Sequence, residues 1–312
     1  MNQGEKIQSL YAQFGQIKGI SIELYKRLIA ISVKNDAATA TIFLQGAQLA
    51  EYKKKGQEPL LWLSEQCDYQ VGSPLRGGVP VCWPWFGDIS RNPDAVKQQV
   101  IGDDLPAHGL VRSVEWELVE INLLDKNTTQ LILSLDVQPS EQWPYAARLQ
   151  LEVTVGTELT LQLRVTNKSE KSFTFTSALH TYLNISDINQ VQVKGLEHAT
   201  YLDTLDNWST QSSTEPLSVK GELDSVYTNI SHPVLIEDKQ WNRSICLQGV
   251  NAPDLVAWNP WIKKSQALSQ FADTDYQQMI CLESAHLLEN AQQLKPEEQF
   301  SFGVQLSSER LL

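Results

Sequence analysis

The chain has 312 residues, of which 42% are hydrophobic, and its 37 acidic and 25 basic side chains give a formal net charge of −12. Nucleic acid or an anionic membrane surface would require a basic face, so this balance argues against both as partners. Residues 1–15 lack the basic start and apolar stretch of a signal peptide, and no segment reaches the roughly 18 apolar residues of a membrane span. We therefore expect a soluble, cytoplasmic protein.

The predicted elements begin with one helix and continue as strands. Apolar residues at positions 7, 10, 11 and 14 predict a helix over 5–14. In residues 158–166 every odd position is apolar, which is the period of a half-buried strand. Further β-rich runs follow at 19–24, 28–33, 39–44, 114–121, 130–137, 148–155, 172–183, 190–193, 234–236, 244–248, 276–282 and 298–306.

A short second helix is expected over 262–271, after Pro260. Strands do not alternate with helices, and no Gly-rich phosphate-binding motif is present, which argues against a parallel nucleotide-binding sheet. The expected fold class is all-β, a sandwich of large, mostly antiparallel sheets with few peripheral helices. No linker or repeat divides the chain. We expect one domain over 1–312, with 1–16 as a helical extension.

The cysteines and histidines show no metal-binding spacing. The four cysteines are far apart in the sequence and form no CxxC pair; buried free thiols fit a large intracellular chain better than disulfides do. The five histidines form neither an HxH nor an HExxH pair. Gly-x-Ser-x-Gly is also absent, which weakens a serine hydrolase interpretation. No metal and no cofactor are predicted, and acid–base chemistry by histidine and carboxylate remains.

His180 and Glu283 are candidates for that chemistry. Alternation along 172–183 places His180 with threonines and Tyr182 on the polar face of a strand, which suits a site on an open sheet surface. Spacing alone favours a surface or hydrogen-bonded structural histidine. Glu283 ends an apolar run, so an inward carboxylate would be desolvated and more basic. A charged residue at a solvent boundary is the commoner reason for such a strand end.

Two arginines lie close to glycines, in Leu75-Arg76-Gly77-Gly78 and in 107–112, which ends at Arg112. Glycine lets a backbone approach a ligand closely, and a guanidinium binds phosphate oxygens through a planar fork of donors. The alternative is that each arginine pairs with an acidic side chain. Two aromatic segments could likewise belong to the core or to a binding site. Trp85 or Phe86 could form a pocket wall. The segment "WNPW" at 258–261 indicates first a turn with core tryptophans, and a sugar-facing role is the second interpretation.

Six blocks in this order resemble one family. They are "RGGVPVCWPWFGD" (76–88), "PAHGLVR" (106–112), "ALHTYL" (178–183), "LDSVY" (223–227), "AWNPW" (257–261) and "ICLES" (280–284). Together they are similar to the glucose-6-phosphate 1-epimerases, the hexose-6-phosphate mutarotases of the galactose mutarotase-like superfamily. The resemblance covers nearly the whole chain. It implies a β-supersandwich that interconverts the α and β anomers of a hexose 6-phosphate without a cofactor. Separately, we expect a monomer.

The resemblance also implies roles for individual residues. His180 matches the general acid and Glu283 the general base; Arg76 and Arg112 match phosphate-binding positions. Asp224 matches an aspartate that contacts sugar hydroxyls, and His108 matches a second pocket histidine. Residues 295–298 depart from the pattern, since Glu297 stands where relatives often have glycine.

Three other functions stay open at this point. A carbohydrate-binding sandwich without activity would bind sugar and show no turnover. A mutarotase for unphosphorylated aldoses would make both arginines structural. A glycoside hydrolase would need a pair of carboxylates, whereas the resemblance singles out a histidine as one partner.

Overall fold

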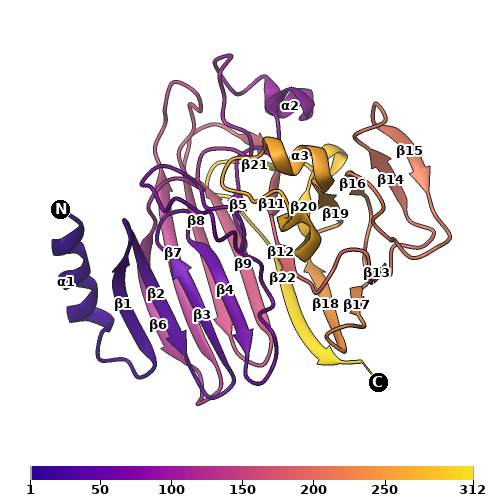
Figure 1. Ribbon diagram of the computed structural model, residues 1–312. Coiled ribbons are helices and arrows are strands. Elements are labelled where there is room, and N and C mark those ends of the chain that lie inside the picture. The colour runs from indigo at the N-terminus through magenta and orange to yellow at the C-terminus, as the bar shows by residue number, and fades with distance from the viewer. Residues whose placement is uncertain (1, 312) are drawn as a thin grey trace.

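The computed structural model describes residues 2–311, in which strands dominate (Figure 1). It contains 22 strands in four sheets, and every pairing between these strands is antiparallel. The predicted all-β class of large antiparallel sheets is therefore confirmed. Within the described part of the chain, no helix is long and apolar enough to cross a membrane.

A four-stranded sheet begins the β structure. Its strands, in order, are β1 (Ile20–Tyr25), β2 (Leu28–Lys34), β3 (Ala38–Phe43) and β4 (Gln48–Lys54). Helix α1 (Gln3–Phe14) precedes it and packs on β1 through Leu10 and Phe14. Asn2 and Glu5 form a capping box that satisfies free amides of the first turn. The helix predicted over 5–14 is confirmed.

One half of an eight-stranded sheet lies behind the first sheet, and the other half extends beside it (Figure 1). Its order is β13 (Val191–Lys194), β17 (Val234–Asp238), β18 (Arg243–Val250), β22 (Gln299–Arg310), β9 (Leu159–Asn167), β8 (Ala147–Val155), β7 (Thr129–Val137) and β6 (Glu117–Leu123). The odd positions of 159–165 are all buried, as the alternation predicts.

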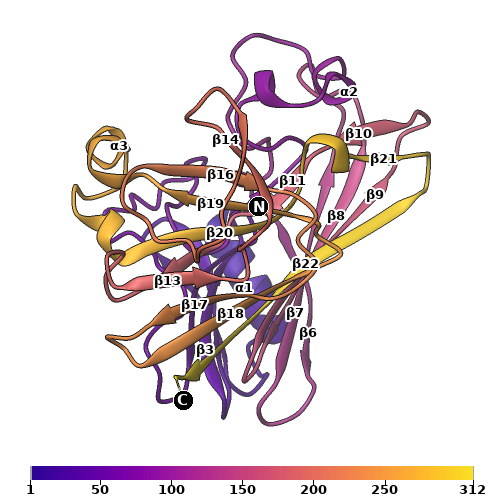
Figure 2. The same cartoon turned by 90° about the vertical axis from the view of Figure 1, so that its right-hand side faces the viewer.

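A second eight-stranded sheet carries the candidate site and lies over β17 and β18 (Figure 2). Its main order is β15 (Ser209–Ser212), β14 (Thr200–Asp203), β16 (Leu223–Tyr227), β19 (Asp254–Asn259), β20 (Met279–His286), β11 (Ser177–Leu179) and β5 (Val81–Cys82), and β12 (Tyr182–Asn184) also pairs with β20. A two-stranded sheet joins β10 (Phe173–Phe175) to β21 (Gln292–Leu294). One apolar cluster runs through all three large sheets.

The remaining helices are short: α2 (Asp94–Lys97), α3 (Trp261–Ala267), and the 3-10 turns η1 (Ile89–Arg91), η2 (Asp275–Gln278) and η3 (Leu288–Asn290). Helix α3 ends four residues earlier than the predicted 262–271, because Leu268 is already extended. The turn predicted at 258–261 is confirmed: Asn259 accepts a hydrogen bond from the Trp261 amide where β19 passes into α3.

Two predicted strands differ from the observed ones at the candidate site. The run 172–183 is not one strand, because its first part pairs with β21 and its later parts pair with β20. The strand predicted over 276–282 starts three residues later, after the turn η2, and runs on to His286. Glu283 therefore lies inside a buried strand and not at its solvent boundary.

Candidate active site

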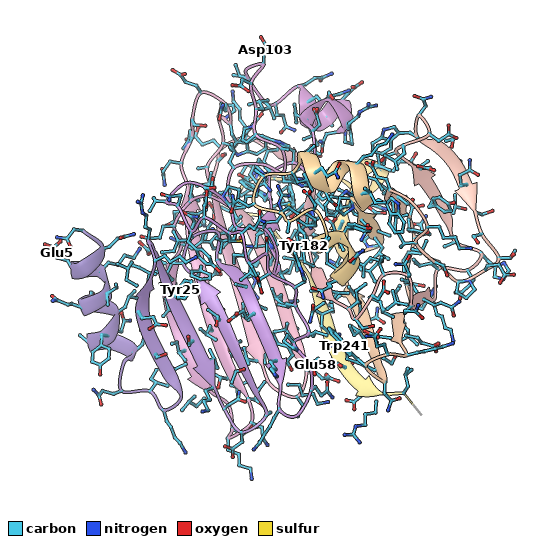
Figure 3. The ribbon with its side chains drawn as sticks, viewed as in Figure 1. Glu5, Tyr25, Glu58, Asp103, Tyr182 and Trp241 are labelled. Atoms are coloured by element: carbon cyan, nitrogen blue, oxygen red, sulfur yellow. The ribbon has the colours of Figure 1, made fainter. Side chains whose placement is uncertain are left out.

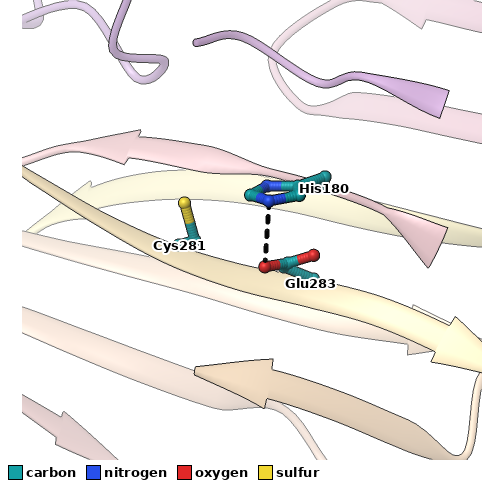
Figure 4. Close-up of side chains that lie close together, drawn as sticks. All are labelled: His180, Cys281 and Glu283. Carbon is teal, nitrogen blue, oxygen red and sulfur yellow. Dashed lines mark ion pairs between the residues drawn. The ribbon is translucent and has the colours of Figure 1, made fainter. Parts of the chain in front are cut away.

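His180 and Glu283 face each other across two neighbouring strands. Both β11 and β12 pair with β20, and the register on either side of position 180 places His180 opposite Glu283. The imidazole Nε2 lies 3.4 Å from the Glu283 carboxylate Oε1 (Figure 4), and the side chains are 9% and 1% exposed. The sheet register thus brings together two groups that are about a hundred positions apart in the sequence.

The open polar face predicted for His180 is wrong. Every residue of 173–183 is buried, whether polar or apolar. The sheet here is covered on both faces, so alternation of polar and apolar residues no longer separates solvent from core. His180 lies within the molecule, with 7% of its surface exposed.

Aromatic rings surround the His180 imidazole. Tyr182 stacks on it at 4.7 Å between centroids with an 11° interplanar angle, and Figure 3 shows Tyr182 near the centre of the molecule. His108 and Trp258 present their edges at 5.3 and 6.2 Å. Phe86 in turn lies 4.9 Å from the His108 ring. These contacts fix the imidazole plane and exclude water from most of it.

Burial moves the pKa values of the pair in opposite directions. Desolvation, followed by repulsion from His108 in its protonated form and from the two arginines, holds the pKa of His180 well below its usual value. Desolvation and the carboxylate of Asp224 raise the pKa of Glu283 well above its usual value. Both shifts favour the uncharged forms, so a protonated His180 is a strong acid and an ionised Glu283 is a strong base.

Both members of the pair keep an unused polar atom. Nδ1 of His180 and Oε2 of Glu283 are buried and have no hydrogen-bond partner among the described residues. Unpaired polar atoms are costly in a protein interior and are uncommon unless a ligand uses them. The site therefore has capacity for a polar ligand at both side chains.

Arg76 and Arg112 both lie near the imidazoles. The positive charge of each lowers the pKa of His108 and of His180. Neither forms an ion pair with a carboxylate of residues 2–311, and the Arg112 guanidinium donates to the Ala107 carbonyl at 2.8 Å. The alternative that these arginines pair with acidic side chains finds no support there. Two unneutralised guanidinium groups next to a buried pair favour an anionic ligand.

His108 is held in an unusual backbone conformation. Its φ is +66°, in the left-handed region that costs a residue with a Cβ about 1 to 2 kcal/mol. The Gly87 amide donates to Nδ1 at 3.3 Å, so the neutral ring carries its proton on Nε2. Burial and the two arginines lower the pKa of His108 to about 3. This histidine is therefore a neutral hydrogen-bond donor across the whole physiological range.

The glycines beside the arginines accommodate protein backbone and not a ligand. A Cβ on Gly78 would lie 2.2 Å from the Leu49 carbonyl oxygen, and one on Gly109 would lie 2.0 Å from that of Trp83. Their positive φ values of 63° and 77° add strain to any side chain. The expectation that they give a ligand access to the backbone is replaced by a packing role, which holds both loops in place.

Gly109→Ala should lower the free energy of unfolding by about 3 kcal/mol, because backbone strain and a clash with Trp83 act together. Gly56→Ala is the matched control, since Gly56 has the same φ of 77° with nothing within 4 Å of the added Cβ. It should cost only the strain, about 1 kcal/mol. Urea unfolding of both variants measures the difference, and equal losses would refute the close-packing role.

Asp224 and Phe86 border a cavity whose lining includes neither His180 nor Glu283, although the Asp224 charge acts on Glu283 and the Phe86 ring lies 6.4 Å from the His180 ring. The cavity has a volume of about 310 Å³, and its lining also includes Thr176, Val226, Trp208 and Leu288. Asp224 lies on β16, and Phe86 follows β5, which is the edge strand of the same sheet. The cavity therefore extends across the sheet between these two strands. Burial raises the pKa of Asp224. The cavity thus offers a half-buried carboxylate on one side and an aromatic ring on the other.

Trp85 and Phe86 differ in their access to this cavity. Phe86 is half-buried and lines it, whereas Trp85 is completely buried and donates its indole N–H to the Pro106 carbonyl at 3.0 Å. Trp83 is also completely buried, against Trp143 and Phe173. The aromatic segment thus serves mainly as core, and the structure does not bring Trp85 to the pocket surface.

Asp254 holds one rim of the cavity through pH-sensitive contacts. Its buried carboxylate accepts hydrogen bonds from the Leu287 amide and the Asn290 side chain, at 2.7 and 2.8 Å. Desolvation nevertheless raises the pKa of Asp254 to about 6. The native protein thus retains a proton that the unfolded chain releases above pH 4. Asp254 should therefore reduce the free energy of unfolding by up to about 3 kcal/mol as pH rises from about 4 to about 6.

Asp254→Asn removes this titration. In urea unfolding at pH 4, 5, 6 and 7, the free energy of unfolding of the wild type should fall more steeply with rising pH than that of the variant. Glu283 and Asp224 also have raised pKa values, so the test is the difference between the two proteins. Parallel pH profiles would refute the assignment.

Tyr182 and Cys281 were not assigned a role in the site from the sequence, and Trp258 was assigned a core or sugar-facing role but no contact with His180. Tyr182 and Trp258 contact the His180 ring, and Cys281 lies two positions before Glu283 on the same face of β20. The alternation along 172–183 places Tyr182 on the same strand face as His180, and this pattern could have indicated the contact between them. For Cys281 only the prediction of a buried free thiol was made. All four cysteines are free, and all but the half-buried Cys246 are buried.

Comparison with known proteins identifies the family of the chain. The profile of the aldose 1-epimerase family matches residues 30–307. The chain belongs to the aldose 1-epimerase family. It is 36% identical over 248 residues to a protein of Haemophilus influenzae, covering 78% of this chain and 80% of the relative. A protein of Escherichia coli is 31% identical over 264 residues, covering 83% of each chain. Both relatives are provisionally named glucose-6-phosphate 1-epimerase.

Solved structures give the same result. A provisionally assigned mutarotase from Salmonella typhimurium superposes with a TM-score of 0.85 at 28% identity, covering 95% of each chain. A galactose mutarotase-like protein from Clostridium acetobutylicum has a TM-score of 0.70 at 15% identity and shares the fold. The resemblance found in the sequence is therefore confirmed at the level of family and fold, and the protein is an epimerase that acts on a carbohydrate.

Proposed function

We propose that the protein interconverts the α and β anomers of D-glucose 6-phosphate and related hexose 6-phosphates. The observation that carries the proposal is the buried His180–Glu283 pair, with one unused polar atom on each side chain and two arginines nearby that lack carboxylate partners. Family membership supplies the reaction, and the names of the relatives support a phosphorylated substrate.

The reaction needs two groups that exchange a proton with the sugar. Glu283 takes the proton from the C1 hydroxyl as His180 gives one to the ring oxygen; the C1–O5 bond breaks and C1 becomes an aldehyde. Rotation about C1–C2 exposes the other face. The same transfers in reverse close the ring, so both residues regain their starting states.

The arginines connect phosphate binding to this chemistry. Their charges disfavour the imidazolium form of His180 in the free protein. A phosphate dianion bound by Arg76 and Arg112 would cancel part of that charge and raise the pKa of His180. The substrate would thereby help to charge the general acid. Asp224 and the neutral His108 are proposed to contact sugar hydroxyls, with Phe86 as a wall.

Exchange spectroscopy by NMR on the two anomeric protons of glucose 6-phosphate tests the proposal. Interconversion should be faster than the spontaneous background, and faster than for glucose or galactose at equal concentrations. Comparing the rate with mannose 6-phosphate to that with glucose 6-phosphate shows which hexose the enzyme prefers. Exchange at the background rate with all four sugars would refute the proposed activity and favour a sugar-binding protein without activity.

We also propose a cytoplasmic monomer that does not bind nucleic acid. The four unpaired cysteines and the net charge of −12 support this. Size-exclusion chromatography with light scattering measures the oligomeric state.

A further inference from the structure

His180, Cys281 and Glu283 place three different ligand atoms around one point. An imidazole nitrogen, a thiol sulfur and a carboxylate oxygen lie within 4.8 Å of one another, and all three residues are buried. Figure 4 shows the His180 ring above the Glu283 carboxylate, with the Cys281 sulfur beside them. The arrangement follows from the sheet: Cys281 and Glu283 are alternate residues of β20, and His180 lies opposite Glu283.

The donor set is that of a borderline-soft transition metal. Zinc binds histidine nitrogen, cysteine sulfur and carboxylate oxygen with tetrahedral geometry, whereas Mg²⁺ and Ca²⁺ require several oxygen ligands. The 3.4 Å separation of Nε2 and Oε1 matches the edge of roughly 3.4 Å expected for a tetrahedron with bonds of about 2.1 Å. The three ligand atoms lie within 4.8 Å of one another, and a Zn–S bond of about 2.3 Å requires an edge from sulfur of roughly 3.6 Å. Three protein ligands leave the fourth position for water.

A second observation does not depend on the spacing of the ligand atoms. The Glu283 carboxylate has a buried oxygen without a hydrogen-bond partner among the described residues, and its side chain is 1% exposed. Buried unpaired oxygen of this kind is the expected state of a ligand-binding atom. The Nδ1 atom of His180 also lacks a partner. Zinc-binding histidines usually donate this second N–H to an acceptor, so binding here should be weaker than in a structural zinc site.

We propose that these three side chains bind Zn²⁺ or a similar thiophilic divalent cation, which inhibits the enzyme reversibly. The inhibition rests on the proposed function, because a cation on Nε2 and on the carboxylate would block both proton transfers. Arg76 and Arg112 oppose a cation electrostatically, so the Cys281 sulfur, whose thiol releases its proton to solvent when the metal binds, is needed as a second negative ligand beside Glu283. Loss of that sulfur should therefore affect cation binding far more than loss of a cysteine elsewhere.

Two measurements on the full chain, freed of metal by chelation and desalting, test the proposal. The first titrates ZnCl₂ into the anomer-exchange assay with glucose 6-phosphate and expresses each rate relative to the zinc-free rate of that variant. Wild type should show inhibition that competes with substrate. Cys281→Ala should need at least about 10-fold more zinc for half-inhibition. Cys246→Ala, which removes a half-buried thiol on β18, should match wild type.

The second measurement needs no activity. CoCl₂ added to the protein should give the near-ultraviolet charge-transfer band of a thiolate-bound cobalt ion in wild type and in Cys246→Ala, and no such band in Cys281→Ala or Cys281→Ser. Near-ultraviolet circular dichroism establishes that both Cys281 variants are folded. A wild-type protein without the band, or an equal band in the Cys281 variants, would overturn the proposal. A band in a protein that does not accelerate anomer exchange would refute the proposed function and leave the metal site standing.

Discussion

Glu283→Gln is expected to lower catalysed anomer exchange in glucose 6-phosphate by about 10²- to 10⁴-fold, the usual contribution of one general acid or base. Glutamine keeps the shape of the side chain but cannot take the C1 hydroxyl proton. His180→Ala should cause a loss of the same order, because it removes the group that protonates the ring oxygen. NMR exchange rates, corrected for the spontaneous reaction, measure both effects.

The control for these variants is His198→Asn. His198 is exposed, lies outside the site and has a φ of +65°, which asparagine tolerates; the variant should keep wild-type exchange. The double variant His180→Ala, Glu283→Gln should be little slower than either single one, because the two groups act as a unit. Near-full activity in either single variant would refute the roles assigned to the pair.

The fold was largely predictable from the sequence because its signal is local. Alternation in 159–165 reports one buried face of β9, and the spacing of apolar residues in 5–14 reports the buried side of α1. Where a sheet is covered on both faces this signal fails. All residues of 173–183 are buried, so a polar residue there indicates neither solvent nor an open site.

The candidate site was predictable residue by residue only through the family resemblance. Nothing in the spacing of His180 and Glu283 shows that they meet, because their contact depends on the register of β11 and β12 on β20. The same register carries Cys281 to the pair, and no metal-binding spacing could reveal it. Chemistry formed between distant strands is set by long-range pairing, which leaves no local pattern in the sequence.

The other prediction with a large effect concerns the two arginines. Arg76→Ala and Arg112→Ala should each raise the KM for glucose 6-phosphate by about 10- to 100-fold, because each charge-assisted contact with phosphate contributes about 1.5 to 3 kcal/mol. Steady-state exchange measurements at several substrate concentrations separate KM from kcat. Arg148→Ala, an exposed arginine paired with Asp136 on the surface of β7 and β8, is the matched control and should leave both constants unchanged.

The comparison with unphosphorylated glucose decides what the arginines do. Glucose carries no phosphate group for the arginines to bind, so the KM for glucose should change little in either variant. The kcat for glucose should even rise, because removing a positive charge near the His180 imidazole lifts its depressed pKa. With glucose 6-phosphate this gain is offset, since the bound phosphate already cancels the arginine charge in wild type. Equal effects on the two sugars would make the arginines structural and favour a mutarotase for unphosphorylated aldoses.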